Sequence, residues 1–316
     1  MIFAPSELLQ RHVWSGSIQN EPERWRITLE EATNAELMHS LENAKYNKNF
    51  DHHSRFDPKM MHIAGLIQEI KSKLSQSGVA LIEGLEGLDE SSIRYLYLKI
   101  GRELGVPVET YGLLYDVTDH GGSYTEQRIP VSQTKASTRM HTDSSQRRVH
   151  PQIVGLACIR PAPVGGGSRL SSASFAHEKL KAEAPELLTA LYHPYIRDLV
   201  TPGSADERMA LIDNSFPIFQ YDQRLFFRYM RYWIERGHHK VGLRLSPLSI
   251  DAFDALDEIL NSPENQLQFT MKSGDFLFID NTLIAHDRDA YQDDPAHKRL
   301  MVRLWLDDLG RENKGD

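Results

Sequence analysis

The chain has 316 residues, 40% of them hydrophobic and 25% charged, a composition typical of a protein that buries a large core. The formal net charge of −8, from 36 basic and 44 acidic side chains, repels phosphate backbones, so we expect no nucleic-acid partner. The single cysteine, Cys158, excludes both an intramolecular disulfide and a cysteine-based metal cage.

Membrane association and secretion are not expected either. No apolar run approaches the ~20 residues that a membrane-spanning helix needs. The first ten residues lack the charged start and apolar run of a signal peptide. We therefore expect a cytoplasmic protein without a membrane partner. The sequence has no internal repeat and no long linker, so we expect one domain over residues 1–316; it does not specify an oligomeric state.

The N-terminal third is expected to be mainly helical around one short strand. Residues 13–60 are polar and predict helical turns and loops. Apolar residues at helical spacing then predict a helix that ends at Gly78, and an apolar run predicts a strand over 79–82. A second helix is expected between its cap, Asp89, and Gly105.

Later in the chain, strands and helices form separate groups. Strands are expected in two clusters, at about 150–170 and 267–306. Helices are expected between them, over 174–192 and again after the cap Ser246, so a helical insert covers about 174–262. This order predicts a mainly β fold with helices (α+β), in which a sandwich or barrel is decorated by helices.

Two of the 14 histidines stand out because of their neighbours, and the first is His141. In an extended segment residues i and i+2 point the same way, so His141 and Asp143 can grip one ion from one side. Two imidazoles and one carboxylate on one face of a metal form the facial triad of non-haem iron(II) oxygenases. A His-x-Asp tripeptide is common, however, and taken alone it is more often structural.

The third ligand of such a triad must come from a distant part of the chain. His286 follows an apolar strand over 276–279, and we expect it at the rim of a late strand. The alternative is a solvated loop histidine, because Asp287, Arg288 and Asp289 follow it directly. Taken alone, the solvated loop is the commoner case.

Two arginines in the last strand are a further sign of a binding site. Strand alternation places Arg299 and Arg303 on one face, with apolar residues on the other. Two buried guanidinium groups on a core strand are costly unless anions meet them, and arginine binds a carboxylate through two parallel hydrogen bonds. The alternative is an edge strand whose arginines pair with Asp307 or Asp308.

In this order and spacing the motifs resemble the TauD/TfdA-like (clavaminate-synthase-like) iron(II)/2-oxoglutarate dioxygenases. The resemblance runs over nearly the whole chain, from about Trp14 to Leu306. It implies a double-stranded β-helix (jelly-roll) core with helices at the N-terminus and a helical insertion between the metal-binding motifs. The motifs that carry it are Ser77–Gly84, His141-Thr142-Asp143, Gly165–Ser168, Ser273-Gly274-Asp275, His286 and Arg299–Leu306.

The resemblance also implies which residues hold the iron and part of the co-substrate. His141, Asp143 and His286 would be the Fe(II) ligands. Arg299, which follows His286 by 13 positions, would pair with the distal carboxylate of 2-oxoglutarate. Because halogenating relatives lack the carboxylate that Asp143 supplies, its presence makes hydroxylation the expected reaction.

Two further residues take roles by the same resemblance. Ser168 stands where the family usually has threonine, and its hydroxyl would be a second donor to the distal carboxylate of 2-oxoglutarate. Arg303 matches a second family arginine, which faces either the 2-oxoglutarate or an anionic substrate. The arginines at 147, 148, 228 and 231 are additional candidates for contacts with such a substrate.

We therefore expect an enzyme that uses dioxygen and 2-oxoglutarate to hydroxylate a C–H bond of a small amino-acid-like or carboxylate metabolite. The co-products would be succinate and carbon dioxide, and the substrate would be anionic or zwitterionic. Desaturation or cyclisation of a natural-product intermediate at the same centre is the alternative. A jelly-roll that binds a ligand without catalysis is a third, less favoured hypothesis.

Three other features have simpler explanations. Ser144 and Ser145 lack the Gly-x-Ser-x-Gly turn of a nucleophilic hydrolase. The neighbours His238 and His239 would diverge by about 100° on a helix, so we expect a solvated helix end rather than a metal site. The aromatic residues within 226–233 are expected to belong to the core, with a pocket wall as the alternative.

Overall fold

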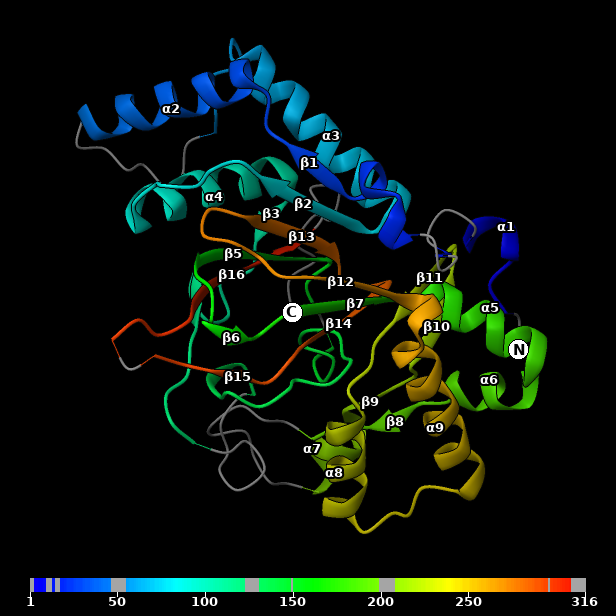
Figure 1. Cartoon of the computed structure of the whole chain (residues 1–316). Helices are drawn as coiled ribbons and strands as arrows, with labels where there is room; N and C mark the ends of the chain where they lie inside the picture. The colour runs from blue at the N-terminus through cyan, green and yellow to red at the C-terminus, as the bar shows by residue number, and fades with distance from the viewer. Residues whose placement is uncertain are drawn as a thin grey trace.

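Two β-sheets packed against each other form the centre of the fold, and helices cover them from outside (Figure 1). The structure, a computed structural model, describes residues 3–9, 13–14, 18–46, 55–122, 131–148, 150–198, 208–294 and 296–307. This arrangement confirms the predicted fold class, a jelly-roll core decorated by helices. Within the described ranges, no helix is long and apolar enough to cross a membrane.

The larger sheet joins strands from both halves of the chain. Apart from the parallel pair β1 and β2, its neighbouring strands are antiparallel. The central strands β13 and β5 are largely buried, which explains the nearly continuous apolar runs in their sequences. In spatial order the sheet contains β1 (Arg26–Thr28), β2 (Val79–Glu83), β13 (Phe276–Asp280), β5 (Ile153–Arg160), β16 (Leu300–Asp307) and β3 (Val106–Pro107), with β4 (Tyr115–Val117) also paired to β16.

The smaller sheet carries one side of the future site. It consists of β12 (Gln266–Phe269), β7 (Ser168–Ser172) and β14 (Ile284–Arg288), and beside it β6 (Val164–Gly165) pairs with β15 (Tyr291–Gln292). The turn that leads into β7 requires glycine at two positions. Gly165 and Gly166 have φ angles of 76° and 72°, and a Cβ atom at Gly165 would collide with the Ala290 carbonyl.

Two helices cover the outer face of the larger sheet, α3 (Met61–Ser77) and α4 (Glu90–Leu104), and α2 (Glu31–Tyr46) packs on these two helices from outside (Figure 1). The predicted ends of α3 at Gly78 and of α4 at Asp89 and Gly105 are confirmed. The expectation of turns and loops over 13–60 is wrong for α2. Its buried positions recur at helical spacing, but they include the small or polar residues Thr33, Ser40 and Ala44, which hide the apolar stripe.

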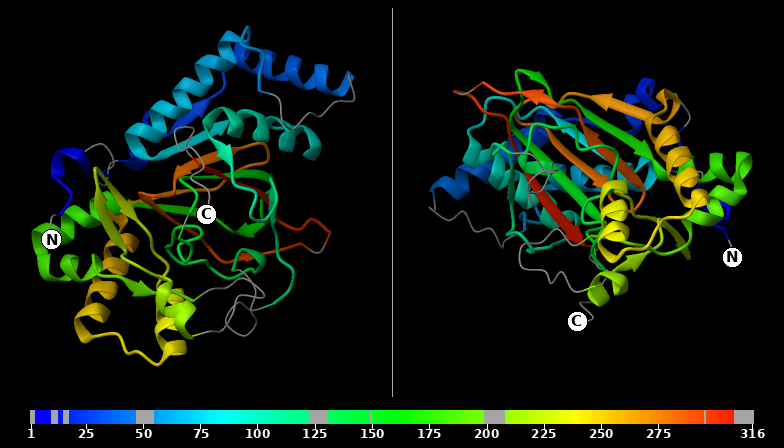
Figure 2. Two further views of the ribbon diagram at one scale, coloured as in Figure 1. Left: turned by 180° about the vertical axis from the view of Figure 1, so that it is seen from behind. Right: turned by 90° about the horizontal axis from the view of Figure 1, so that it is seen from below.

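The helical insert lies between β7 and β12, on another side of the sheets from α2 and α3 (Figure 2). The helices expected over 174–192 are confirmed as two, because the chain turns at Ala184 and Pro185 begins the second one. Besides helices the insert contains short strands, which the sequence did not predict. Its elements are α5 (Ala173–Glu183), α6 (Pro185–Leu191), β8 (Tyr195–Ile196), α7 (Arg208–Asp213), β9 (Ser215–Phe216), β10 (Phe219–Asp222), β11 (Arg224–Phe227), α8 (Arg231–Val241) and α9 (Pro247–Asn261).

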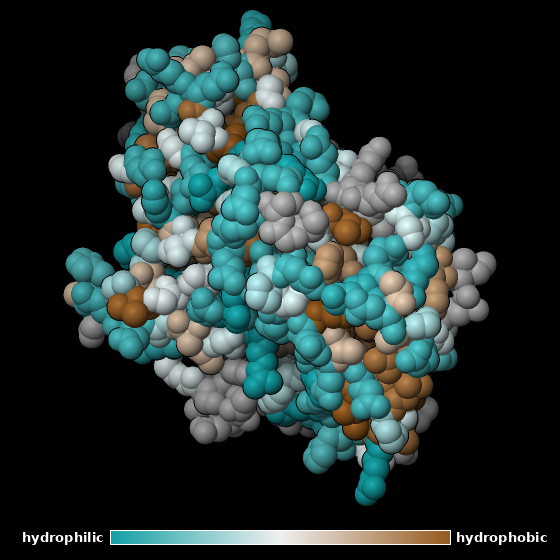
Figure 3. Space-filling model, turned by 45° about the vertical axis from the view of Figure 1, so that its right-hand side comes forward, coloured by the Kyte–Doolittle hydropathy of each residue, from teal (hydrophilic) through white to brown (hydrophobic). Residues whose placement is uncertain are grey.

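Short elements complete the described chain: α1 (Ser6–Leu9) and 3-10 turns at Ile18–Asn20, Pro22–Arg24, Val131–Gln133 and Pro263–Asn265. The surface in Figure 3 is mostly hydrophilic, with separate hydrophobic patches. Ile250 contributes to the exposed apolar surface. It lies on α9 with 41% of its surface exposed, whereas Phe253 and Leu256 on the same helix are fully buried.

Alternation along β16 connects the outer core to the interior between the sheets. Leu300, Val302 and Leu304 share the apolar face that alternation predicts, and this face packs toward the N-terminal helices. Met301 belongs to the core between the two sheets, and Arg303 lines a cavity there. β16, which pairs with β5 in the larger sheet, therefore also brings the Arg303 guanidinium into the space between the sheets.

Candidate active site

A cavity of about 430 Å³ lies between the two sheets, a volume suited to a small molecule. Side chains of β5, β13 and β16 form one wall, and side chains of β7 and β14 form the other. Residues of the segment 132–146 also line the cavity. The histidines, carboxylates and guanidinium groups on its lining are His141, Asp143, His286, Asp287, Arg288, Arg299 and Arg303.

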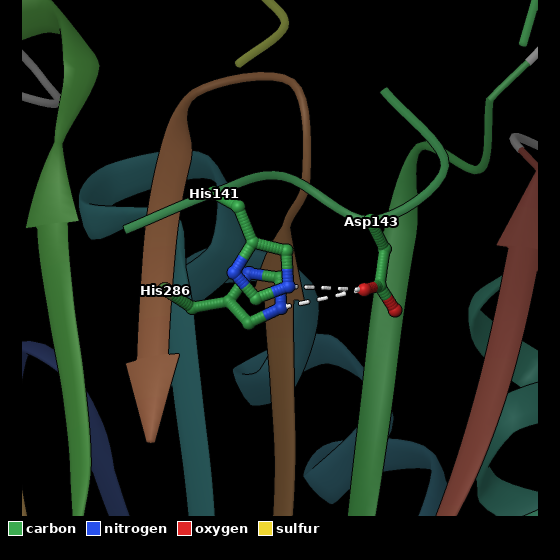
Figure 4. Close-up of side chains that lie close together, drawn as sticks. All are labelled: His141, Asp143 and His286. Carbon is green, nitrogen blue, oxygen red and sulfur yellow. Dashed lines mark ion pairs between the residues drawn. The ribbon is translucent and has the colours of Figure 1, made fainter. Parts of the chain in front are cut away.

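The predicted triad comes together on this lining. The potential ligand atoms of His141, Asp143 and His286 all lie within 4.8 Å of one another. The Nε2 atoms of His141 and His286 lie 3.5 and 3.6 Å from Oδ1 of Asp143. Figure 4 shows both imidazole rings facing the same carboxylate oxygen, so two nitrogens and one oxygen converge from one side. This donor set is the one that a facial-triad iron(II) centre requires.

The two histidines are also joined through their backbones. The His141 N–H donates to the His286 carbonyl at 3.1 Å, and the His286 N–H donates back at 2.8 Å. His286 lies inside β14, opposite Leu170 of β7, and not at the rim of a strand as expected. Its neighbours Asp287 and Arg288 are buried, so the alternative of a solvated loop histidine is wrong as well.

Neighbouring polar groups fix the His141 ring. Its Nδ1 lies 2.8 Å from the Arg139 carbonyl, so that Nδ1 carries the proton and Nε2 is left for a ligand. Arg139 has a φ angle of 58°, a left-handed conformation that turns this carbonyl toward the ring. Burial lowers the pKa of His141, but the hydrogen bond to Asp143, the Asp143 charge and the bond to the Arg139 carbonyl together outweigh burial, so the pKa lies above its ordinary value. Burial and the charge of His141 lower the pKa of His286.

Asn281, which sequence reasoning did not assign to the site, holds the backbone of Asp143. Its Oδ1 accepts the Asp143 N–H at 2.8 Å, and its Nδ2 donates to the Asp143 carbonyl at 3.1 Å and to the Pro151 carbonyl at 2.9 Å. Asn281 is fully buried directly after β13. An asparagine directly after an apolar strand is the only signal that the sequence offers for this role.

The second oxygen of Asp143 points away from the histidines and meets two donors of β16. The indole Nε1–H of Trp305 donates to Oδ2 at 2.7 Å, and Nη1 of Arg303 donates to it at 3.2 Å. Burial alone raises the pKa of Asp143. The Arg303 charge and the two histidines outweigh burial and hold that pKa well below its ordinary range. Asp143 is therefore an anion when the protein is folded.

Arg299 is buried in the cavity wall without an anionic partner among the described residues. It is 3% exposed, and its Nη1 has no hydrogen-bond partner there. Its guanidinium group lies over the Tyr291 ring at 5.1 Å, and burial lowers its pKa. The predicted Ser168 lines the same cavity from β7. The alternative of an edge strand is wrong, because β16 lies between β5 and β3. Asp308, which that alternative offered as an arginine partner, lies outside the described residues.

Residues that follow His286 tie down the segment that precedes His141. The Asp287 carboxylate accepts the Thr138 hydroxyl at 2.9 Å and also pairs with Arg169. Arg288 donates to the carbonyls of Thr134, at 2.9 Å, and Ala136. Burial, together with the charge of Arg299, lowers the pKa of Arg288 to about 10. These bonds leave Arg288 engaged with protein carbonyls, so it is not a free cation for a ligand.

The other arginines that the sequence suggested for the substrate do not line the cavity. Arg231 pairs instead with Glu235, Asp254 and Asp257 on the outer side of the insert. Arg228 donates to the carbonyls at positions 147 and 148. The aromatic run at 226–233 is divided: Phe227 and Tyr229 are core residues, as expected, but Trp233 lines the cavity.

Fold and donor set together define the class of this protein: a jelly-roll enzyme whose non-haem iron works with 2-oxoglutarate. Residues 22–305 match the family model of taurine catabolism dioxygenases, the TauD, TfdA family. The chain therefore belongs to this family, and it is a 2-oxoglutarate-dependent non-haem iron dioxygenase.

Known proteins of this kind are similar over most of the chain. FR-33289 synthase of Streptomyces rubellomurinus (strain ATCC 31215) is 27% identical over 311 residues, which covers 94% of this chain and 89% of that protein. Uridine-5'-phosphate dioxygenase of Streptomyces sp is 26% identical over 249 residues, 75% of this chain and 81% of that protein. The structure of asparagine oxygenase with Fe(II), 2S,3S-3-hydroxyasparagine and succinate has the same fold, with a TM-score of 0.67, 17% identity and coverage of 92% and 96% of the two chains.

Proposed function

We propose that this dioxygenase hydroxylates a C–H bond of a small amino-acid-like or carboxylate metabolite and releases succinate and carbon dioxide. The observation that carries the proposal is the convergence of His141, Asp143 and His286, whose ligand atoms lie within 4.8 Å of one another on the cavity lining. We assign these three residues as the iron ligands. Bound iron(II), with 2-oxoglutarate as reductant, supplies the activation of dioxygen that amino-acid side chains cannot provide.

The surroundings of Arg299 support its assignment to 2-oxoglutarate. A guanidinium group that is buried without a counter-charge is unfavourable, and a carboxylate ligand would relieve this cost. Nη1 of Arg299 has no partner among the described residues, and a bidentate carboxylate would occupy it. Ser168 lines the same cavity and would donate its hydroxyl to the same carboxylate.

The charges on the cavity lining favour an anionic or zwitterionic substrate. Three arginines and two aspartates line the cavity, an excess of one positive charge with the histidines neutral. Iron(II) and 2-oxoglutarate bring opposite charges of equal size and leave this excess unchanged. Arg299 would be neutralised by 2-oxoglutarate and Arg288 is engaged with carbonyls, so Arg303 remains as the cation for a substrate carboxylate or another anion.

The names of similar proteins agree with a small polar substrate. Uridine-5'-phosphate dioxygenase is named for a molecule that bears a phosphate. The asparagine oxygenase structure contains a hydroxylated amino acid. A free amino acid combines an anionic carboxylate with a compact body, which suits a cavity of about 430 Å³. These similarities support the substrate class and leave its identity to experiment.

Anaerobic titration with iron(II) and 2-oxoglutarate tests the assignment of the site. The wild-type protein should develop a metal-to-keto-acid charge-transfer band, and His141→Ala should lose it. His39→Ala is the matched control, since His39 is exposed on α2 and contacts Asn43. Succinate release, screened over amino acids and carboxylates, then identifies the substrate, and a product heavier by one oxygen atom supports hydroxylation. A wild-type protein with neither band nor succinate release would contradict the proposed function.

We also propose that residues 1–316 form one domain and that the enzyme works in the cytoplasm. The insert is tied to the core at both ends: Ser172, the last residue of β7, caps α5, and Asn265 after α9 bonds to the Ser172 backbone. Met230 and Trp233 of the insert line the cavity, which supports folding as one unit. A single buried cysteine is consistent with a reducing compartment. One cooperative unfolding transition, seen by both near- and far-UV circular dichroism, would support a single domain.

A further inference from the structure

The two oxygens of the Asp143 carboxylate lie in different surroundings. Oδ1 faces both histidine Nε2 atoms, at 3.5 and 3.6 Å. Oδ2 receives the Trp305 indole N–H at 2.7 Å and the Arg303 guanidinium at 3.2 Å. The carboxylate is thus oriented before any ion binds, with one oxygen toward the metal position and the other turned into β16.

Trp305 is itself firmly held. Its carbonyl accepts the Val108 N–H at 2.8 Å, and its Cα pairs with Val154 of β5. The Tyr111 ring meets the indole edge-on at 5.5 Å, and the Arg303 guanidinium lies over the ring at 4.4 Å. Only 8% of the residue is exposed. A side chain enclosed on these sides has little freedom to withdraw its donor from Asp143.

A donor on one carboxylate oxygen restricts how the group binds a metal. A free carboxylate can coordinate through one oxygen or both, and binding through both would occupy an additional position on the ion. A facial triad functions only if positions stay open for 2-oxoglutarate and dioxygen. Hydrogen-bond partners outside the ligands commonly set such orientations, and their loss weakens metal binding by about 10- to 100-fold.

The two donors differ in what else they can do. Trp305 has a single N–H and lies in a fixed position, whereas the Arg303 guanidinium has five N–H donors on a flexible stem. Arg303 can therefore leave Oδ2 for an anionic ligand, and the indole bond remains. The shorter of the two hydrogen bonds, at 2.7 Å against 3.2 Å, is the one from Trp305.

We propose that Trp305 is a positioning residue that keeps Asp143 a one-oxygen ligand of the iron and thereby releases Arg303 to bind an anionic substrate. The proposal rests on the function proposed for the site. Trp305 thus does more than line the cavity: it orients a metal ligand.

Anaerobic cobalt(II) titration tests the proposal, because cobalt(II) reports its coordination through visible absorption and does not oxidise in the assay. Trp305→Phe should bind cobalt(II) about 10- to 100-fold more weakly than wild type, with a changed absorption spectrum. Trp25→Phe is the matched control for a lost buried indole bond, since Trp25 donates to the Ile18 carbonyl at 2.9 Å outside the cavity. Trp233→Phe controls for a smaller aromatic group on the cavity lining. Both controls should keep the wild-type cobalt(II) spectrum.

A second variant keeps the test decisive if Trp305→Phe does not fold. Arg303→Met removes the other donor and a positive charge, so cobalt(II) should bind as tightly as in wild type or more tightly. A tenfold weaker affinity in Arg303→Met would show that Arg303, not Trp305, orients Asp143. Unchanged affinity and spectrum in folded Trp305→Phe would overturn the proposal equally. Failure of the proposed function has a different signature, because the wild-type protein itself would then bind no cobalt(II) at the triad.

Discussion

His141 and His286 exchange both of their backbone hydrogen bonds, as two residues of neighbouring antiparallel strands do. A separate backbone bond joins the same two segments nearby, where the Thr138 N–H donates to the Arg288 carbonyl at 3.2 Å. The backbone thus fixes the distance between the two imidazoles before any metal binds. The third member of the triad, Asp143, lies beyond this ladder, and its position depends on side-chain contacts.

Asn281→Ala should weaken metal binding because Asn281 holds the backbone of Asp143. The substitution leaves the buried N–H and carbonyl of Asp143 without their amide partner. We expect the free energy of unfolding to fall by about 1–3 kcal/mol. We expect affinity for cobalt(II) or iron(II) to fall about tenfold. Chemical denaturation and anaerobic metal titration measure the two effects.

Asn265→Ala provides the matched control for that experiment. Asn265 is equally buried and its amide also bridges a backbone, with Oδ1 accepting from Ser172 N at 3.0 Å and Nδ2 donating to its carbonyl at 3.1 Å. It lies at the base of the insert, away from the triad. Asn265→Ala should destabilise the fold to a similar degree and leave metal affinity unchanged. Equal losses of metal affinity in both variants would mean that Asn281 has no specific role at the site.

Arg299→Gln should lose affinity for 2-oxoglutarate and retain the metal. A hydrogen bond to a charged group contributes about 1.5–3 kcal/mol, so its loss should raise the dissociation constant about 10- to 100-fold. Titrating the charge-transfer band with 2-oxoglutarate measures this loss. Arg160→Gln is the control, because Arg160 is exposed at the end of β5 and donates to the Lys298 carbonyl at 3.1 Å. If Arg299→Gln binds 2-oxoglutarate normally, the carboxylate contacts another cation.

The main features of the fold could be predicted because alternation and helix caps are local signals. The apolar face of β16 and the helix ends at Gly78 and Asp89 follow from neighbouring residues alone. Helix α2 could not be found in this way, because small and polar residues occupy much of its buried face. The true partners of Arg231 could not be predicted either. They include acidic residues of α9, a helix that the fold brings within reach of Arg231 at the start of α8.

The same distinction between local signals and contacts of distant segments applies to the site. His141, Asp143, His286 and Arg299 have motif neighbours that identify them, and the structure brings all four to one cavity. Hydrogen bonds that join distant segments leave no pattern in the sequence. Trp305 lies within the closing motif and Asn281 follows an apolar strand, and neither position indicates the contact with Asp143 that the fold creates.

Asp275→Asn should stabilise the protein at neutral pH. Asp275 is 1% exposed, and burial, with the negative charges of Glu83 and Glu86, raises the pKa of its carboxyl to about 6. The folded state therefore favours the protonated acid. The stability that protonation provides is complete below about pH 4, where the unfolded chain also keeps the proton, and it is lost as pH rises through about 6.

The amide cannot ionise. The free energy of unfolding of the variant should therefore rise relative to that of wild type between about pH 4 and 6, and the difference should stay constant above that range. We expect this difference to be on the order of 3 kcal/mol, since the pKa is raised by about two units and each unit corresponds to about 1.4 kcal/mol. Thermal unfolding at pH 5.0 and 7.5 measures the difference. Asp251→Asn, at an exposed position of α9, should show no such pH dependence. A uniform effect of Asp275→Asn at both pH values would point to a change in hydrogen bonding instead.

Arg303→Met should separate substrate binding from the binding of metal and 2-oxoglutarate. Arg303 is the guanidinium on the cavity lining that would remain for a substrate anion. Its loss should raise the KM for the substrate found by succinate release about 10- to 100-fold, as expected for a lost charged hydrogen bond. The 2-oxoglutarate affinity from the charge-transfer titration should stay within about twofold of wild type, because the proposed partner of its distal carboxylate is Arg299.

Arg303→Lys keeps a positive charge and should recover part of the loss, although lysine cannot form the bidentate pair. Arg224→Met, which removes an exposed guanidinium that lies over Phe226 at 4.3 Å, should behave as wild type. An unchanged KM in Arg303→Met would show that the substrate anion binds elsewhere, and a loss of 2-oxoglutarate binding would assign Arg303 to the co-substrate instead.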